Sequence, residues 1–216
     1  MSRHTDIDDH YAPRYVVWEL TLKCDLACRH CGSRAGRPRD EELSLEESLD
    51  LLGQLNDLGA REITFIGGEA YLYPHWLEVI SACAQLGIRP TMTTGARNLD
   101  LETCRTMKEA GMSGVSISVD GLEQTHDELR AVKGSFRSAL QSFQNCKEVG
   151  IPVFANTQIN QRNIHELSEL AAVFAEVGIK EWQVQITGPM GRAADRPEWL
   201  LPVSYTHLTL PTKNEV

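Results

Sequence analysis

The chain has 216 residues, of which 42% are hydrophobic, so it can form one sizeable domain or one domain and part of a second. Its formal net charge is −9 and it shows no basic stripe, so we expect no nucleic-acid partner. No apolar run approaches the ~20 residues that cross a bilayer, and residues 1–15 lack the pattern of a secretion signal. We therefore expect a cytoplasmic protein without a membrane partner.

Strand-like and helix-like segments alternate along the chain from Arg14 onward. The patterns predict strands at 15–21, 62–66, 89–94, 114–119, 153–157 and 182–186, and helices at 45–58, 76–86, 101–110, 135–149 and 164–177. Each helix is followed by a glycine, as a left-handed C-cap requires. Repeated strand–helix units imply a parallel sheet with the helices outside. The fold class is therefore predicted as α/β, a partial (β/α)6 TIM-like barrel that is truncated after the sixth strand.

The first predicted helix has a clear start, because Ser44 and Glu47 form the pattern of a capping box. Its leucines recur at helical spacing and are expected to share one buried face. They are Leu45, Leu49, Leu52, Leu55 and Leu58.

We expect three regions: an N-terminal extension at 1–13, a core domain at 14–201 and a non-native tail at 202–216. Within the tail, Val203–Thr212 resembles the translation of a transposase adapter used in sequencing libraries. We therefore expect the natural gene to continue past about Leu201. Without a further helix, the outer apolar surface of the sixth strand would be exposed, which predicts poor solubility.

Three cysteines, Cys24, Cys28 and Cys31, form a C-x3-C-x2-C run directly after the first strand. In a reducing compartment such a group favours metal ligation over disulfides. A structural zinc site needs four ligands, usually with a second cysteine pair, and His30 lies too close to Cys31 to supply the fourth ligand easily. A [4Fe–4S] cluster with one iron left open fits better. The isolated cysteines Cys83, Cys104 and Cys146 are expected to be buried small hydrophobic residues.

Other polar residues gather where predicted strands end, and in a barrel of this kind the active site forms at those ends. Gly67, Gly68 and Glu69 follow the second strand, Thr94 and Gly95 the third, and Ser118 and Asp120 the fourth.

These motifs resemble those of radical S-adenosylmethionine (SAM) enzymes. The cysteine run resembles the cluster signature, and Gly67-Gly68-Glu69 resembles the second motif, although Ala70 stands where proline is common. Ser118–Gly121, His126–Arg130 and Lys133–Phe136 resemble the branch that often carries a C-terminal SPASM domain. The resemblance covers about residues 14–201 and implies a radical SAM core with two cofactors, a [4Fe–4S] cluster and SAM. It also implies an electron donor of flavodoxin or ferredoxin type.

The resemblance also implies residue roles. Cys24, Cys28 and Cys31 would ligate the cluster, and the backbone of Gly67 and Gly68 would approach the methionine part of SAM. Glu69 would pair with the SAM ammonium, and His30 would pack near the adenine. Ser118 would face the ribose or the carboxylate of SAM. Arg130 would either hold the SAM carboxylate or form a surface salt bridge.

Further positions are less constrained. Asp120 is interpreted as a cap for the turn after the fourth strand, Trp18 as filling for the barrel, and Pro189–Arg192 as a loop that approaches SAM or substrate. Polar residues within otherwise apolar strands either line the cavity or serve the structure; they are Asn156, Gln158, Gln183 and Gln185. The histidines His75, His126 and His165 show no ligand spacing and are expected at the surface or in caps.

The resemblance implies that a SAM-derived radical abstracts hydrogen from a peptide or a small molecule. We favour a maturase acting on a ribosomal peptide, with cofactor or tetrapyrrole biosynthesis as the alternative. A third hypothesis is a non-enzymatic module that binds zinc or an iron–sulfur cluster.

Overall fold

The computed structural model describes residues 13–201 and contains one six-stranded parallel sheet, with the strands in the order β1-β2-β3-β4-β5-β6. The strands are β1 (Tyr15–Thr21), β2 (Glu62–Gly67), β3 (Arg89–Thr94), β4 (Gly114–Ser118), β5 (Val153–Ile159) and β6 (Trp182–Ile186). The helices are α1 (Leu45–Asp57), α2 (Trp76–Gln85), α3 (Leu101–Glu109), α4 (Glu123–Arg130), α5 (Ser135–Glu148) and α6 (Leu167–Val177).

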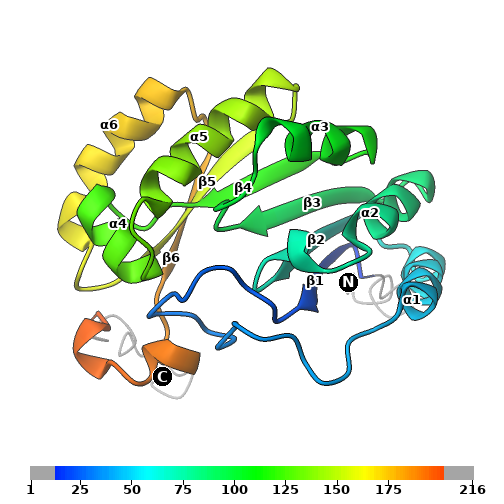
Figure 1. The fold of residues 1–216 in the computed structure, drawn as a ribbon, viewed down its shortest axis with the longest axis horizontal. Helices are drawn as coiled ribbons and strands as arrows, with labels where there is room; N and C mark the ends of the chain where they lie inside the picture. The colour runs from blue at the N-terminus through cyan, green and yellow to red at the C-terminus, as the bar shows by residue number, and fades with distance from the viewer. Residues whose placement is uncertain (1–12, 202–216) are drawn as a thin grey trace, which may run out of the picture.

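The helices cover the outer side of a curved sheet, and the long segment between β1 and α1 crosses the end of the sheet (Figure 1). The prediction of a partial barrel with six parallel strands is confirmed. The adapter-like segment Val203–Thr212 and most of the proposed extension at 1–13 lie outside the described residues. Within residues 13–201, no helix combines the length and the apolar character of a membrane span.

The two faces of the sheet differ because strand side chains alternate. On β2, Ile63 and Phe65 are fully buried beneath the helices, whereas Thr64 and Ile66 line the inside of the barrel. Trp18 packs on Phe65 with ring centroids 5.9 Å apart and so belongs to the core on the helix side, not to the barrel interior. The inner face is left largely polar, and it forms the wall of the cavity described below.

Helix α1 begins at the predicted capping box. The Ser44 hydroxyl accepts a hydrogen bond from the Glu47 N–H, and the Glu47 carboxylate accepts one from the Ser44 N–H at 2.8 Å. Leu52 is fully buried, but Leu49 and Leu58 are exposed, so the predicted leucine face is wrong at those two positions. The buried stripe is narrower than the leucine spacing indicates because α1 lies at the edge of the sheet (Figure 1).

Helix α4 was not predicted from the sequence. It has only eight residues, most of them polar, and no side chain caps its N-terminus. Tertiary contacts hold it instead: the Glu166 carboxylate accepts the Leu122 N–H, and the Asp127 carboxylate accepts the N–H groups of Gly134 and Phe136. None of these contacts joins residues at helical spacing, so the periodic pattern of the sequence does not reveal the helix.

His126 on α4 is completely buried, so its predicted surface or capping role is wrong. Its Nδ1 accepts a hydrogen bond from the Asp120 N–H at 3.0 Å, and its ring meets Phe136 edge to face. Burial, with the nearby Arg130 charge, lowers the pKa of His126 to about 3. The imidazole is therefore neutral in the folded protein at neutral pH.

The outer face of β6 is exposed, as expected. Val184 and Ile186 keep 45% and 49% of their surface accessible. Exposed neighbouring apolar side chains on a sheet promote association between molecules.

We expect the double substitution Val184→Thr/Ile186→Thr to raise the concentration at which residues 1–216 stay monodisperse in size-exclusion chromatography with light scattering. The control is Leu58→Thr, which changes a leucine outside the sheet that is 57% exposed. Equal solubility of both variants and the unchanged chain would contradict the role of β6.

We expect His126 to lower the free energy of unfolding as the pH drops below about 6.5, because unfolded histidine binds a proton near that pH whereas folded His126 does so only near 3. His126→Asn keeps an acceptor for the Asp120 N–H but cannot titrate, so it should lose less stability between pH 7 and 5. Urea unfolding across this range measures the difference, with the exposed His165→Asn as control. The idea fails if wild type and His126→Asn show the same pH dependence.

Candidate functional site

A cavity of about 370 Å³ lies at the carboxyl ends of the strands. Every predicted ligand-binding residue lines it: Cys24, Cys28, His30, Cys31, Gly67, Gly68, Glu69, Ser118 and Arg130. The inward-facing amides of β5 and β6 line it too; they are Asn156, Gln158, Gln183 and Gln185. The fold therefore brings together candidates that are separated by up to about 160 residues of sequence.

The three cysteine sulfurs lie in the segment between β1 and α1, residues 22–44, which we call the cysteine segment, and each accepts a hydrogen bond. Leu26 N–H donates to Cys24 Sγ and Ala35 N–H to Cys31 Sγ, both at 3.4 Å, while Arg130 donates to Cys28 Sγ at 3.6 Å. Cys28 is buried and the other two are half-buried. Burial, with the nearby Glu69, raises the pKa of the Cys24 thiol to about 12. Such a thiol becomes a thiolate at neutral pH when a cation binds it.

The spacing of these sulfurs argues against a single zinc ion. Tetrahedral zinc with Zn–S bonds of about 2.3 Å places its sulfur ligands about 3.8 Å apart. Among residues 13–201, one group of at least three metal-binding side chains has all its ligand atoms within 4.8 Å of one another. Cys28 and Cys31 do not belong to that group, so the three cysteine sulfurs are not all this close together. A multi-iron cluster spans more widely separated thiolates. The donor set and its spacing therefore fit a cluster better than zinc.

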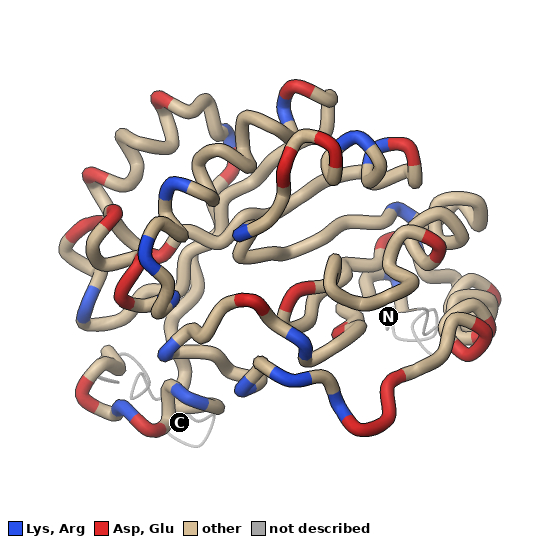
Figure 2. The backbone as a smooth tube through the Cα atoms, in the orientation of Figure 1, with Lys and Arg blue, Asp and Glu red and all other residues tan. Residues whose placement is uncertain are grey.

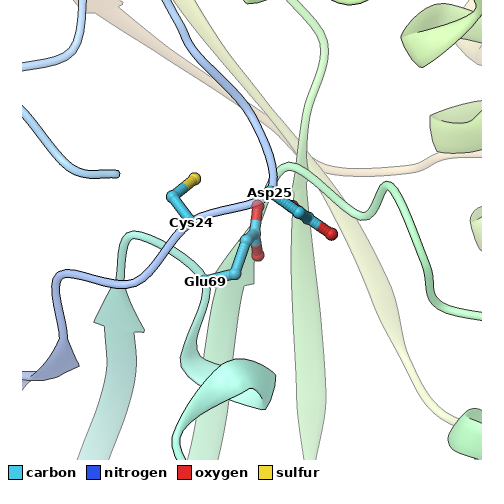
Figure 3. A group of neighbouring side chains, drawn as sticks. All are labelled: Cys24, Asp25 and Glu69. Carbon is cyan, nitrogen blue, oxygen red and sulfur yellow. The ribbon is translucent and has the colours of Figure 1, made fainter. Parts of the chain in front are cut away.

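The compact group consists of Cys24, Asp25 and Glu69, which converge from the cysteine segment and the end of β2 (Figure 3). Asp25 Oδ2 accepts hydrogen bonds from the Tyr71 hydroxyl at 2.9 Å and from Asn98 at 2.6 Å. Asp25 thus ties the cysteine segment to the loops after β2 and β3. Asp25 was not predicted as a site residue; the one signal for it in the sequence is a carboxylate directly beside Cys24.

Gly67 and Gly68 pack against the cysteine segment itself. A Cβ on Gly68 would lie 2.6 Å from the Cβ of Cys24 and 2.7 Å from the Leu22 carbonyl oxygen, distances that real Cβ atoms essentially never show. Any larger residue would push the cysteine segment away from β2. The structure thus gives the glycines a packing role beside their predicted approach to SAM.

Glu69 is 1% exposed and is held by neighbours at the carboxyl end of β3. Its carboxylate accepts hydrogen bonds from the Thr94 hydroxyl at 2.5 Å and from the Gly95 N–H at 2.7 Å. Burial outweighs these donors and raises the pKa of Glu69 to about 8. A buried acid of this kind favours a cationic partner in the cavity, because a neighbouring positive charge stabilises its ionised form.

Asp120 is 1% exposed and is not a turn cap, which corrects the sequence interpretation. Its Oδ2 lies 2.5 Å from Arg130 and 2.9 Å from His30 Nε2, and its Oδ1 accepts the Gln158 N–H. Burial raises the pKa of Asp120, but Arg130 and His30 outweigh it and hold that pKa well below its usual range. His30 and Arg130 are also buried, so Arg130 does not form a surface salt bridge.

The segment after β6 closes over the cysteines. Arg192 donates from Nε to the Cys28 carbonyl at 2.7 Å and from Nη1 to the Ala35 carbonyl at 3.0 Å. Its backbone N–H donates to the Cys31 carbonyl at 2.8 Å. The loop at 189–192 was predicted to approach the site, and Arg192 does line the cavity, but its contacts are to the cysteine segment.

The chain was compared with known proteins. The model of the radical SAM superfamily matches residues 18–185. The chain is 35% identical over 162 residues to Fe-coproporphyrin III synthase of Methanosarcina barkeri (strain Fusaro / DSM 804), covering 74% of this chain and 41% of the relative. It is 31% identical over 187 residues to the sporulation killing factor maturation protein SkfB of Bacillus subtilis (strain 168), covering 87% and 46%.

Among solved structures, Streptococcus suis SuiB bound to SAM matches with a TM-score of 0.73 and 22% identity, covering 85% of this chain and 44% of SuiB. The same protein was also solved bound to its precursor peptide SuiA. This likeness supports the fold, while the chain spans about half the length of the curated relatives it matches. The match over most of the sequence shows that the chain belongs to the radical SAM superfamily, whose cofactors are a [4Fe–4S] cluster and SAM.

Proposed function

We propose that residues 14–201 form the SAM-cleaving core of a radical SAM enzyme. The observation that carries the proposal is the convergence of three cysteine sulfurs and the buried Glu69 on one cavity. Cys24, Cys28 and Cys31 would hold three irons of the cluster and leave the fourth open for SAM. When bound, the cluster and SAM supply a 5′-deoxyadenosyl radical that abstracts hydrogen from a substrate.

The residues around the cavity would orient SAM. Glu69 would accept a hydrogen bond from the SAM ammonium, whose positive charge would stabilise the ionised form of this buried carboxylate. Ser118 would face the ribose or carboxylate, and His30 would lie near the adenine. Arg130 would reach the SAM carboxylate with Nε, a buried donor without a hydrogen-bond partner among the described residues. Gly67 and Gly68 would let the backbone approach the methionine part.

The enclosure of the site would protect the reactive species from water. Arg192 and Asp25 tie the cysteine segment to the loops after β6, β2 and β3, and Cys28 is buried. The remaining opening would admit substrate and, at the cluster, an electron from a donor of flavodoxin or ferredoxin type. Figure 2 shows basic residues along much of the segment between β1 and α1, followed by a run of acidic residues next to α1; such a donor would approach along this segment.

For the substrate we favour a ribosomal peptide. Ser118, Asn156 and Gln183 are register partners across β4, β5 and β6, and Gln158 and Gln185 form a second such pair. Side-chain amides donate and accept at once, which matches the alternating donors and acceptors of a peptide backbone. Peptide maturation by SkfB and the SuiA complex of SuiB support this class.

The alternative substrate is a tetrapyrrole, which the 35% identity to Fe-coproporphyrin III synthase favours. Coproporphyrins carry several carboxylates, and such groups are usually bound by arginine. Within residues 13–201, the arginines that line the cavity are Arg130 and Arg192. Arg192 binds carbonyls of the cysteine segment, and the one unpartnered donor of Arg130, Nε, is the one proposed to reach SAM. The polar interior therefore suits a peptide better.

We expect the chain, reconstituted anaerobically with iron and sulfide, to turn brown and to form 5′-deoxyadenosine from SAM after reduction with dithionite. Cys28→Ala should abolish both signals because it removes a cluster ligand. Cys83→Ala should keep both, since Cys83 is a fully buried residue of α2 that does not line the cavity. A colourless zinc protein, or cleavage that survives Cys28→Ala, would contradict the proposal.

We expect Gln183→Leu/Gln185→Leu to leave substrate-free SAM cleavage unchanged and to abolish the extra 5′-deoxyadenosine that a peptide substrate induces. The assay offers the protein a short precursor peptide encoded beside its gene, or iron-coproporphyrin III, and follows the mass of each. Val184→Ser, on the outer face of the same strand, serves as control. Modification of the porphyrin alone would favour the tetrapyrrole alternative.

A further inference from the structure

The guanidinium of Arg130 lies between a cysteine sulfur and a buried carboxylate. Its Nη1 donates to Cys28 Sγ at 3.6 Å, and its Nη2 lies 2.5 Å from Asp120 Oδ2. Arg130 is 9% exposed and Asp120 is 1% exposed. Water therefore does little to screen these charges from the cysteine site.

The backbone fixes this arrangement as firmly as the ion pair does. The cysteine segment docks on the last turn of α4: the Arg29 N–H donates to the Leu129 carbonyl at 2.8 Å, and the Ala27 N–H to the Arg130 carbonyl at 3.4 Å. These carbonyls have no partner within the helix, because a helix leaves its last carbonyls free. Ala131 then turns left-handed, with φ of 55°, and ends the helix. Arg130 thus cannot move away from Cys28 without disrupting this junction.

Keeping such a pair buried costs desolvation energy that an apolar pair would avoid. Asp120 orients the guanidinium: it holds one nitrogen while the other points at Cys28. His30, two residues after Cys28, holds the same carboxylate oxygen at 2.9 Å. The positive charge of Arg130 therefore faces Cys28, and the negative charge of Asp120 lies against another nitrogen of the same guanidinium.

We propose that Arg130 and Asp120 are positioning residues that set the reduction potential of the cluster held by Cys24, Cys28 and Cys31, with opposite signs. This inference rests on the proposed function. Reduction adds negative charge to the cluster and its sulfurs. A guanidinium that donates to Cys28 Sγ stabilises that added charge and raises the potential. The Asp120 carboxylate opposes the addition and lowers it.

The opposite signs separate this role from general loosening of the site. Arg130→Gln removes the positive charge and should lower the potential, whereas Asp120→Asn removes the negative charge and should raise it. If the two residues only held the cysteine segment in place, both substitutions would change the potential in the same direction. The double variant Arg130→Gln/Asp120→Asn, which leaves no unpaired buried charge, should lie between the single variants.

The experiment is a redox titration of the full chain, reconstituted with iron and sulfide and without SAM, followed by electron paramagnetic resonance. We expect each single substitution to change the ratio of reduced to oxidised cluster at fixed potential at least tenfold, which is about 59 mV for a one-electron couple. Arg29→Gln is the matched control, because Arg29 lies on the same segment but pairs with Glu128 at 3.6 Å in solvent.

Counts of iron and sulfide separate the possible failures. If the unchanged chain builds no cluster, the proposed function fails and this inference falls with it. If clusters form but all potentials match that of Arg29→Gln, or if both single substitutions shift the potential the same way, the inference alone is overturned. If the Arg130→Gln variant builds too little cluster, we would compare Arg130→Lys and the double variant with the unchanged chain instead, because both variants keep the buried charges balanced.

Discussion

The buried contact between Asp120 and Arg130 connects the parts of this molecule that make the site. Asp120 follows β4, and its side chain reaches the end of α4 through Arg130, the cysteine segment through His30 and β5 through the Gln158 N–H. Its own N–H is accepted by His126. A single ionised carboxylate would be costly in this interior, so each of these partners is needed to keep it there. The contacts that stabilise the Asp120 carboxylate thus also position the elements around the cavity.

The cysteine segment depends on its neighbours for its shape, since it contains no helix and forms only an isolated bridge between Lys23 and Gly36. Gly68 allows β2 to touch it, Asp25 joins it to two loops, and Arg192 holds its carbonyls from the far edge of the sheet. These contacts hold the three cysteines at the cavity independently of one another's side chains. Preorganisation of this kind lowers the cost of forming a metal site.

Much of the fold could be predicted because its signals are local. Short apolar segments such as Tyr15–Thr21 and helical spacing before glycines placed the strands and most helices close to their observed bounds. The cysteine run and Gly67-Gly68-Glu69 were recognisable since each motif is contiguous. Helix α4 was missed because its stability comes from Glu166 and Asp127, which bond to partners outside any helical pattern. The roles of Asp25 and Asp120 were missed for the same reason.

The sequence by itself determined the order of the six strands and of the helices other than α4, the cysteines proposed to bind iron and the edge of the sheet where they gather. These follow from periodicity and from residue chemistry, which neighbouring positions carry without further context. The tertiary structure alone decided that His126 is buried and neutral and that Arg130 faces a cysteine sulfur. It also decided that the amides of β5 and β6 face the cavity. Such facts depend on which segments meet in space, because burial and pairing set the charge of a group and the direction in which it points.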